Sequence, residues 1–273
     1  SLQKICLMHG IEVDYYKKLF QTAGNIIELI EKDDIPKYLL FLENVFPYMD
    51  NYNYQKGMKE IIQELKNFLK PKDIGTDSDR ALLLDFQATL EIKPEKAIKL
   101  EKDALAQIEN ITADNARLVS NLHANLGGLY RMNGHPDLAR EHMEKSISLL
   151  DQFNLLHIND SIPQIANYAM FLTEQQEPER GISELQKLSG IIKEYHSDDC
   201  LDYAKVQETL GTIYLMTANL PQAKTHFKRA FKIYEKIWAD EPEMIEAKYQ
   251  EIQELYPQIG FCIGKNLSGL LTK

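Results

Sequence analysis

The segment Leu126-Gly127-Gly128-Leu129-Tyr130 decides the fold, because its pattern returns further along the chain as Leu210-Gly211-Thr212-Ile213-Tyr214. Midway between these two copies lies Tyr168-Ala169-Met170-Phe171-Leu172, which keeps the small residue and the large apolar one. Equally spaced copies of one pattern indicate a repeat protein, in which a single unit cannot bury its apolar face alone and must stack on its neighbours.

The 42-residue step between copies continues beyond these segments. Three further repeat positions keep a small or a large residue at this step: Ala139, Gly181 and Ala223; Met143, Leu185 and Phe227; Ser146, Leu188 and Ala230. Three prolines follow the same step, at Pro94, Pro136 and Pro178. Proline is tolerated in the first turn of a helix, where its missing N–H has no partner to lose, so Pro136 is expected to begin a helix.

The spacing within one copy predicts a helical hairpin. Leu126, Gly127 and Tyr130 lie on one face of a helix, which is interrupted by Asn133-Gly134-His135-Pro136. The second helix then carries its own buried face, with Ala139 at the position facing Gly127. Both residues are small because two antiparallel helices must approach closely there.

The joint pattern of small and large positions resembles the tetratricopeptide repeat, and the 42-residue period resembles the kinesin-light-chain type of this family. Residues 120–239 contain three clear copies, and residues 78–119 contain an earlier one. The earlier copy departs from the pattern at Asp85 and Glu101, where a small and a large apolar residue are expected. The resemblance implies an all-α fold, a right-handed α-solenoid of antiparallel helical hairpins, with atypical helical caps at both ends.

We expect two parts of the chain, an N-terminal helical segment over residues 1–75 and a repeat array with C-terminal capping helices over residues 76–273. Helical periodicity predicts helices within 11–33, 35–50 and 53–70, and residues 70–77 have the composition of a linker. Near the C-terminus, residues 242–256 fit the first helix of another hairpin, and residues 261–271 fit a final capping helix.

Composition limits the partners and the compartment. The excess of 41 acidic over 31 basic side chains gives a net charge of -10, which disfavours direct binding of nucleic acid. The three cysteines, Cys6, Cys200 and Cys262, are far apart and odd in number, which favours a reducing cytoplasm over a disulfide framework. No apolar run approaches the ~20 residues needed to cross a bilayer, and no signal peptide is evident, so we expect a cytoplasmic protein without a membrane partner.

Motifs for catalysis and metal binding are not evident. The sequence contains no HExxH, G-x-S-x-G or Cys–His signature, and we expect neither catalysis, nor a metal, nor a cofactor. His142 and His226 occupy the same repeat position two repeats apart, which indicates a recurring surface residue of the repeat and not a metal or acid–base site. His196, Asp198, Asp199 and Cys200 are more consistent with a solvated loop between repeats than with a zinc site.

The resemblance also implies where a protein or an extended peptide would bind, since the first helices of successive hairpins line a concave groove in this family. The face opposite the core predicts the groove residues Asn121, Asn125, Arg131, Asn167, Met170, Lys205 and Thr209. Asn125 and Asn167 match the groove-facing asparagine of the kinesin-light-chain type, whose carboxamide can pair with a peptide backbone, and Thr209 replaces it in the third copy. Arg131 and Lys205 would bind an acidic group of the ligand, and the flexible side chain of Met170 would provide an apolar contact in the groove.

Three functions therefore remain open. The first is a non-catalytic scaffold that binds a protein or a peptide in this groove. The second is a ligand- or peptide-sensing regulatory domain of a larger bacterial transcription regulator or signalling ATPase. The start at Ser1 and the separate N-terminal helices favour this hypothesis. The third is an enzyme on an α-helical scaffold, which would need ionisable groups that converge in a deep pocket. The oligomeric state is left open.

Overall fold

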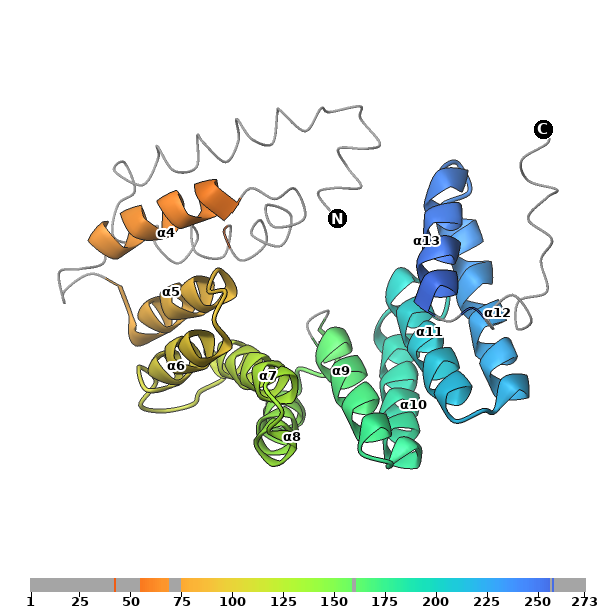
Figure 1. Cartoon of the computed structure of the whole chain (residues 1–273), viewed down its shortest axis with the longest axis horizontal. Coiled ribbons are helices and arrows are strands. Elements are labelled where there is room, and N and C mark those ends of the chain that lie inside the picture. Colours follow the sequence, from red (N-terminus) through yellow and green to blue (C-terminus); the bar gives the residue numbers. More distant parts are fainter. Residues whose placement is uncertain (1–41, 43–54, 69–74, 159–160, 256, 258–273) are drawn as a thin grey trace. The chain divides into compact units, whose positions relative to one another are not determined.

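The computed structural model describes residue 42 and residues 55–68, 75–158, 161–255 and 257. Within these residues every regular element is a helix, which confirms the expected all-α class (Figure 1). The helix bounds are α4 Gln55–Phe68, α5 Asp77–Thr89, α6 Pro94–Leu105, α7 Ala116–Met132, α8 Pro136–Gln152, α9 Ser161–Glu174, α10 Pro178–Tyr195, α11 Leu201–Met216, α12 Leu220–Ile237 and α13 Pro242–Leu255.

The helices predicted within 53–70 and 242–256 are confirmed as α4 and α13. The helices predicted within 11–33, 35–50 and 261–271, and most of the linker predicted at 70–77, lie outside the described residues. Pro94, Pro136 and Pro178 begin α6, α8 and α10, as expected from the place of proline in the first helical turn.

The turns inside three successive hairpins repeat as faithfully as the helices do. In each turn one residue has a positive φ, and these residues follow the same repeat step: Gly134 at 76°, Gln176 at 65° and Ala218 at 58°. The next residue donates its backbone N–H to a carbonyl of the preceding helix, in the pairs His135–Tyr130, Glu177–Leu172 and Asn219–Tyr214. The left-handed residue lets the chain reverse within a short turn, so the second helix returns along the first.

The chain forms two compact units, residues 1–142 and 143–273, and each is described by itself. The boundary predicted between residues 75 and 76 lies inside unit one. In unit one, α4 packs on α5, and α6 packs on both α5 and α7. Ala81 of α5, Ala104 of α6 and Leu122 of α7 form a fully buried cluster where these three helices meet.

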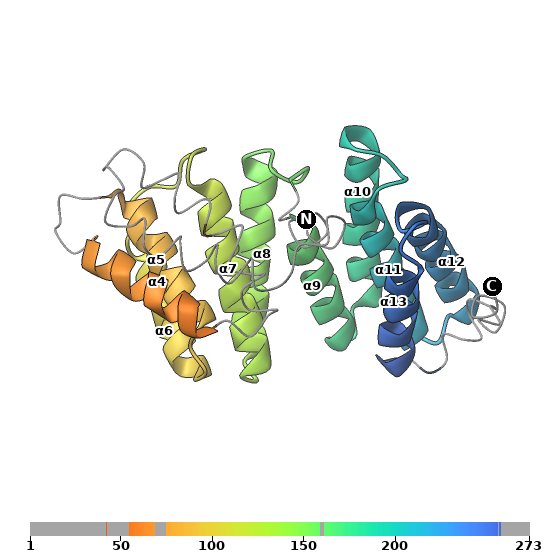
Figure 2. The ribbon, with the colours of Figure 1, turned by 90° about the horizontal axis from the view of Figure 1, so that it is seen from above.

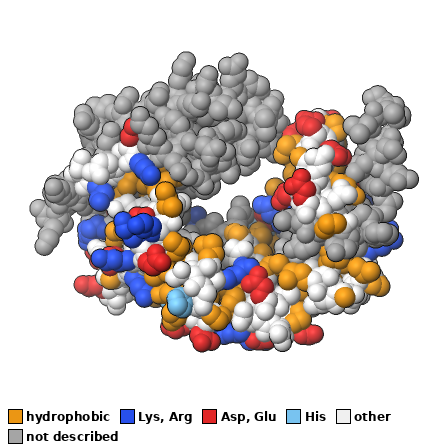
Figure 3. All heavy atoms as spheres, in the orientation of Figure 1, with side chains coloured by type: hydrophobic (Ala, Val, Ile, Leu, Met, Phe, Trp, Pro, Cys, Tyr) orange, Lys and Arg blue, Asp and Glu red, His pale blue; other side chains and the backbone are white. Residues whose placement is uncertain are grey.

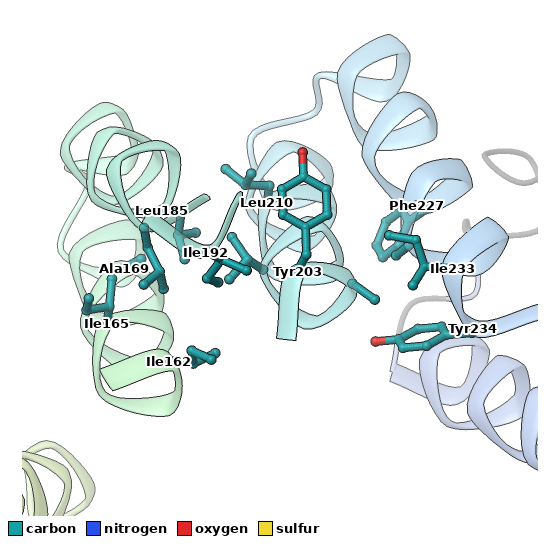
Figure 4. Close-up of a cluster of buried hydrophobic side chains, with 14 of the residues drawn as sticks. Ile162, Ile165, Ala169, Leu185, Ile192, Tyr203, Leu210, Phe227, Ile233 and Tyr234 are labelled. Carbon is teal, nitrogen blue, oxygen red and sulfur yellow. The ribbon is translucent and has the colours of Figure 1, made fainter. Parts of the chain in front are cut away.

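In unit two, α9 packs on α10, and α11 packs on α9, α10 and α12 (Figures 1 and 2). This is the stacking of an α-solenoid, in which a first helix contacts both helices of the preceding hairpin. Figure 4 shows side chains of α9 to α12 in one apolar cluster, including Leu185, Leu210 and Phe227. A Cβ on Gly211 would lie 3.0 Å from the ring of Phe227, so the small residue at this repeat position leaves room for a large residue of the second helix.

Candidate functional site

In unit two, the first helices α9 and α11 bury one side and leave another accessible. Their buried sides are formed by Ile165, Ala169 and Leu172 on α9 and by Val206, Leu210 and Ile213 on α11. Four of the predicted groove residues lie on these two helices: Asn167, Met170, Lys205 and Thr209. We call these four residues the first-helix face of unit two.

On α9, Asn167 is exposed and directly precedes the buried Tyr168. Its carboxamide therefore reaches solvent from a backbone that the hairpin core holds in place. Met170 lies one turn further along, is partly buried and packs against the core of unit two. Only part of its side chain is thus available for contact with a ligand.

On α11, Lys205 is exposed, and its ammonium group lies 3.9 Å from Asp202, one turn earlier. An ion pair of this length in solvent contributes little, so Lys205 can exchange it for another carboxylate. The Thr209 hydroxyl donates to the backbone carbonyl of Lys205 at 3.0 Å. Because the hydroxyl proton is used within the helix, Thr209 offers a partner an acceptor rather than a donor.

A polar network joins α11 to α12 and α13 beside this face. Glu208 binds Lys248 at 3.1 Å through one carboxylate oxygen and accepts the hydroxyl of Tyr234 at 2.6 Å through the other. Burial acts to lower the pKa of Lys248, but the carboxylates of Glu208 and Glu251 outweigh it and raise this pKa. The sequence did not indicate this network, because Glu208 and Lys248 belong to different hairpins and each resembles an ordinary surface charge.

In unit one, the remaining predicted groove residues lie on α7. Asn121 and Arg131 are partly exposed, and Asn125 is exposed. The carboxamide of Asn125 is nevertheless engaged, because its Nδ2 donates to Oδ1 of Asp85 on α5 at 2.9 Å. Asn125 thus differs from Asn167, its counterpart one repeat later, in having a partner on a neighbouring first helix.

The two acidic departures from the repeat pattern come together at this point. Glu101 of α6 is 2% exposed and hydrogen-bonds to Asp85 of α5. Burial, followed by the charge of Asp85, raises the pKa of Glu101 to about 10. Burial also raises the pKa of Asp85, although hydrogen bonds from Glu101 and Asn125 oppose it. The sequence placed both residues correctly in the repeat, but it did not show that they contact each other.

The two histidines that recur two repeats apart join the helices of their hairpins. Nδ1 of His142 lies 2.8 Å from Nδ1 of His123, and its ring stacks on Tyr130. In the equivalent place of unit two, Nδ1 of His226 lies 2.9 Å from Oε1 of Gln207, and its ring stacks on Tyr214. These histidines therefore hold the second helix against the first. This role is more specific than the recurring surface position that their spacing indicated.

The polar loop before α11 is occupied by structural contacts. His196 Nε2 lies 2.9 Å from the carbonyl of His157, Asp198 lies 3.7 Å from Lys193, and Asp199 pairs with Lys236. The sulfur of Cys200 accepts the backbone N–H of Tyr203 and caps the start of α11. Across the described part of the chain, no three His, Cys, Asp or Glu residues are grouped as metal ligands.

Charge is unevenly distributed over the described surface. Figure 3 shows Lys and Arg side chains gathered over α5 and α6, although the whole chain has a net charge of -10. The exposed or partly exposed lysines of α6 and the residue before it are Lys93, Lys96, Lys99 and Lys102. None of the helices with described bounds combines the length and the apolar character that a bilayer crossing requires.

Comparison with known proteins agrees with this architecture. The model of the tetratricopeptide repeat family matches residues 161–236, which span α9 to α12 of unit two. Among solved structures, BtubC (BKLC) from P. vanneervenii is 16% identical and aligns over 81% of this chain and 74% of its own, with a TM-score of 0.50. A search of the curated proteins found no match.

Two structures of a putative kinesin light chain from Podosopora anserina, with nearly identical TPR-like repeats, are also similar. The first is 13% identical over 72% of this chain and 96% of its own, with a TM-score of 0.55. A variant of the same protein is 13% identical over 74% of this chain and 98% of its own, with a TM-score of 0.58. Residues 161–236 therefore match the tetratricopeptide repeat family, and the chain is similar in fold to kinesin light chain-like repeat proteins.

Proposed function

We propose that the chain is a non-catalytic scaffold that binds a protein or an extended peptide on the first-helix face of unit two. Tetratricopeptide repeats generally mediate protein–protein interaction, and their fold is typically a scaffold without catalysis. The observation on which the proposal rests is the exposed carboxamide of Asn167, one residue before the buried Tyr168 of α9. A carboxamide both donates and accepts, so it can satisfy either side of a peptide bond.

Lys205 and Thr209 extend this surface along α11. Lys205 supplies a cation for an acidic side chain or a terminal carboxylate, because its present pairing with Asp202 is long and solvent-exposed. Thr209 adds an acceptor close by, since its hydroxyl proton is directed to the carbonyl of Lys205. The expected ligand is therefore an extended peptide that presents a free N–H group and an acidic group.

A peptide selection followed by titration tests this proposal. A displayed library of random short peptides is selected on the full chain, and a selected peptide is titrated calorimetrically against the wild type and Asn167→Ala. Loss of one or two hydrogen bonds is worth about 1–1.5 kcal/mol, so affinity should fall about five- to tenfold. Lys205→Glu should weaken the same peptide further if the peptide contains an acidic residue.

The matched control is Gln186→Ala, which alters an exposed amide on the second helix α10. Its affinity for the peptide should equal that of the wild type. A peptide whose binding depends on Gln186 and not on Asn167 would place the binding surface on the second helices and refute the proposed face. Failure to select any peptide would argue against peptide binding altogether.

We also propose that the protein is cytoplasmic and does not contact nucleic acid directly. Three scattered cysteines suit a reducing compartment, and the net charge of -10 opposes association with phosphate backbones. Fluorescence microscopy of a tagged chain and a nucleic-acid binding assay at low salt would test the two statements separately.

A further inference from the structure

Asp85 and Glu101 occupy equivalent places in the two helices of the first described hairpin. Asp85 lies between Ala81 and Ala88 on α5, one helical turn from each. Glu101 lies in the same way between two further buried alanines on α6, Ala97 and Ala104. Since residues at these spacings share one face of a helix, each carboxyl group lies in the middle of an alanine-lined contact surface.

The Glu101 carboxyl group is buried, the Asp85 carboxyl group is partly exposed, and both have few partners. Glu101 is 2% exposed, and its Oε2 has no hydrogen-bond partner among the described residues. Asp85 bonds to Glu101 and accepts from Nδ2 of Asn125 at 2.9 Å. The group thus joins α5, α6 and α7 through three side chains that meet at one point.

If both Asp85 and Glu101 were ionised, the two carboxylates would repel each other. The charged Oε2 of Glu101 would also be buried without a hydrogen-bond donor. One proton between them removes the repulsion and supplies the donor for the Asp85–Glu101 hydrogen bond. The carboxamide of Asn125 then donates to the remaining negative charge. The raised pKa of both groups follows from this burial and proximity.

No positive charge of the surrounding helices is among the causes of the shifts at Asp85 and Glu101. Arg80 of α5 bonds to the carbonyl of Gly75 and to Asp77, and Lys102 of α6 lies over the ring of Tyr130. The other charged or titratable residues described on the helices packed around the pair are Lys59, Glu60 and Lys66 on α4, Asp77 and Asp79 on α5, Glu95, Lys96, Lys99 and Asp103 on α6, and Arg117, His123, Tyr130 and Arg131 on α7. The shifts at Asp85 and Glu101 arise from burial, from each other and from Asn125.

We propose that Asp85 and Glu101 share a single proton and, together with Asn125, form a pH-responsive clamp that joins α5, α6 and α7 of unit one. This inference concerns the stability of unit one and does not depend on the proposed peptide-binding face of unit two. The folded unit keeps a proton that the unfolded chain releases above the ordinary pKa of a carboxyl group. The contribution of this pair to the stability of unit one is therefore fully present below the ordinary pKa of a carboxyl group and falls as the pH rises toward the raised pKa of the pair.

Urea unfolding of the full chain, followed by far-ultraviolet circular dichroism between about pH 6 and about pH 9, tests the clamp. One retained proton changes the unfolding equilibrium constant about tenfold for each pH unit. Over this range the unfolding equilibrium constant of the wild type should therefore rise at least tenfold more than that of Glu101→Gln. The amide of this variant keeps the hydrogen bond to Asp85 and does not titrate. Trp238, the only tryptophan, lies in unit two, so its fluorescence follows the unfolding of that unit in the same samples.

Two further variants keep the test decisive. Asp103→Asn removes an exposed carboxylate from the same helix α6 and should follow the pH dependence of the wild type. The double variant D85A/E101M introduces the residue types of later repeats, Ala169 and Met143, and should lose the pH dependence even if Glu101→Gln folds poorly. Equal pH dependence in the wild type, Glu101→Gln and D85A/E101M would overturn the proposal, and so would an effect of Asp103→Asn as large as that of Glu101→Gln.

Discussion

Gly181 of α10 lies directly against the backbone of Ala169 on α9. A Cβ atom on Gly181 would lie 2.6 Å from the carbonyl oxygen of Ala169, which is far inside van der Waals contact. Both residues belong to the small repeat positions, so this contact is the close helix crossing that the 42-residue pattern predicts. The obstacle is backbone, which cannot move aside without displacing a helix.

Gly181→Ala is accordingly expected to destabilise unit two. Overpacking against a fixed backbone costs about 1–3 kcal/mol, and the better helix propensity of alanine offsets at most about 1 kcal/mol of it. The change is measured as the shift in the urea midpoint followed by Trp238 fluorescence. Gly190→Ala on the same helix is the control: a Cβ there meets nothing within 4 Å, so alanine should stabilise by about 0.5–1 kcal/mol. Equal effects of the two substitutions would contradict the close crossing.

Ala218→Gly should stabilise the protein, although it removes a side chain. Ala218 has a φ of 58° in the α11–α12 turn, a conformation in which a Cβ costs about 1–2 kcal/mol. Glycine lacks this strain but loses more chain entropy on folding, so the net gain should be about 0.5–1 kcal/mol in thermal or urea unfolding. The control is Ala106→Gly, at a helix end with a φ of -69°, where glycine should be neutral or destabilising. A loss of stability in Ala218→Gly would show that the turn is not held in the left-handed conformation.

Asn125→Ala and Asn167→Ala should differ in stability, although both asparagines occupy the same repeat position. Asn125 donates to Asp85, and loss of a hydrogen bond to a partly buried carboxyl group costs about 1–2 kcal/mol. Asn167 is exposed, so its substitution should stay within about 0.5 kcal/mol of the wild type. The gain in helix propensity is common to both variants, and the difference between their free energies of unfolding isolates the contact. Equal free energies of unfolding for the two variants would show that the contact between Asn125 and Asp85 does not stabilise the protein.

His123→Gln should reduce the loss of stability in acid. Burial, assisted by the charge of Lys102 and opposed by that of Glu141, lowers the pKa of His142 below 6.5. Protonation therefore favours the unfolded chain, and stability falls as the pH decreases through about 6.5. Two facing imidazoles cannot both be charged, whereas the carbonyl of glutamine accepts from a protonated His142 as Gln207 can from His226. The acid-induced loss of stability between about pH 7 and about pH 5 should therefore be smaller in His123→Gln than in the wild type.

The reciprocal substitution, Gln207→His, provides the control for this interpretation. It creates in unit two the pair of histidines now present in unit one, and it should increase the acid-induced loss of stability followed by Trp238 fluorescence. If neither substitution changes the pH dependence, the contact between the two repeat positions is not the source of acid sensitivity.

The repeat architecture could be predicted because it depends on residues that are close in sequence. The small and large positions within each repeat predicted the all-α fold and the close crossing of small residues seen at Ala169 and Gly181, and the spacing of the prolines predicted the start of helices at proline. These features follow from helical periodicity and side-chain volume, which a single chain segment already contains. The same reasoning placed Asn167 and Lys205 on the accessible side of their helices, where both are exposed.

Only the tertiary structure decided which polar groups meet. Asn125 and Asp85 lie in different hairpins, as do Glu208 and Lys248, and their contacts depend on how each helix is rotated against its neighbour. The left-handed turns at Gln176 and Ala218 could not be predicted from the sequence either, because neither residue type favours that conformation. The two packed helices impose it. Periodicity determines which face of a helix is buried, whereas the partner of each buried polar atom is determined only when several helices pack together.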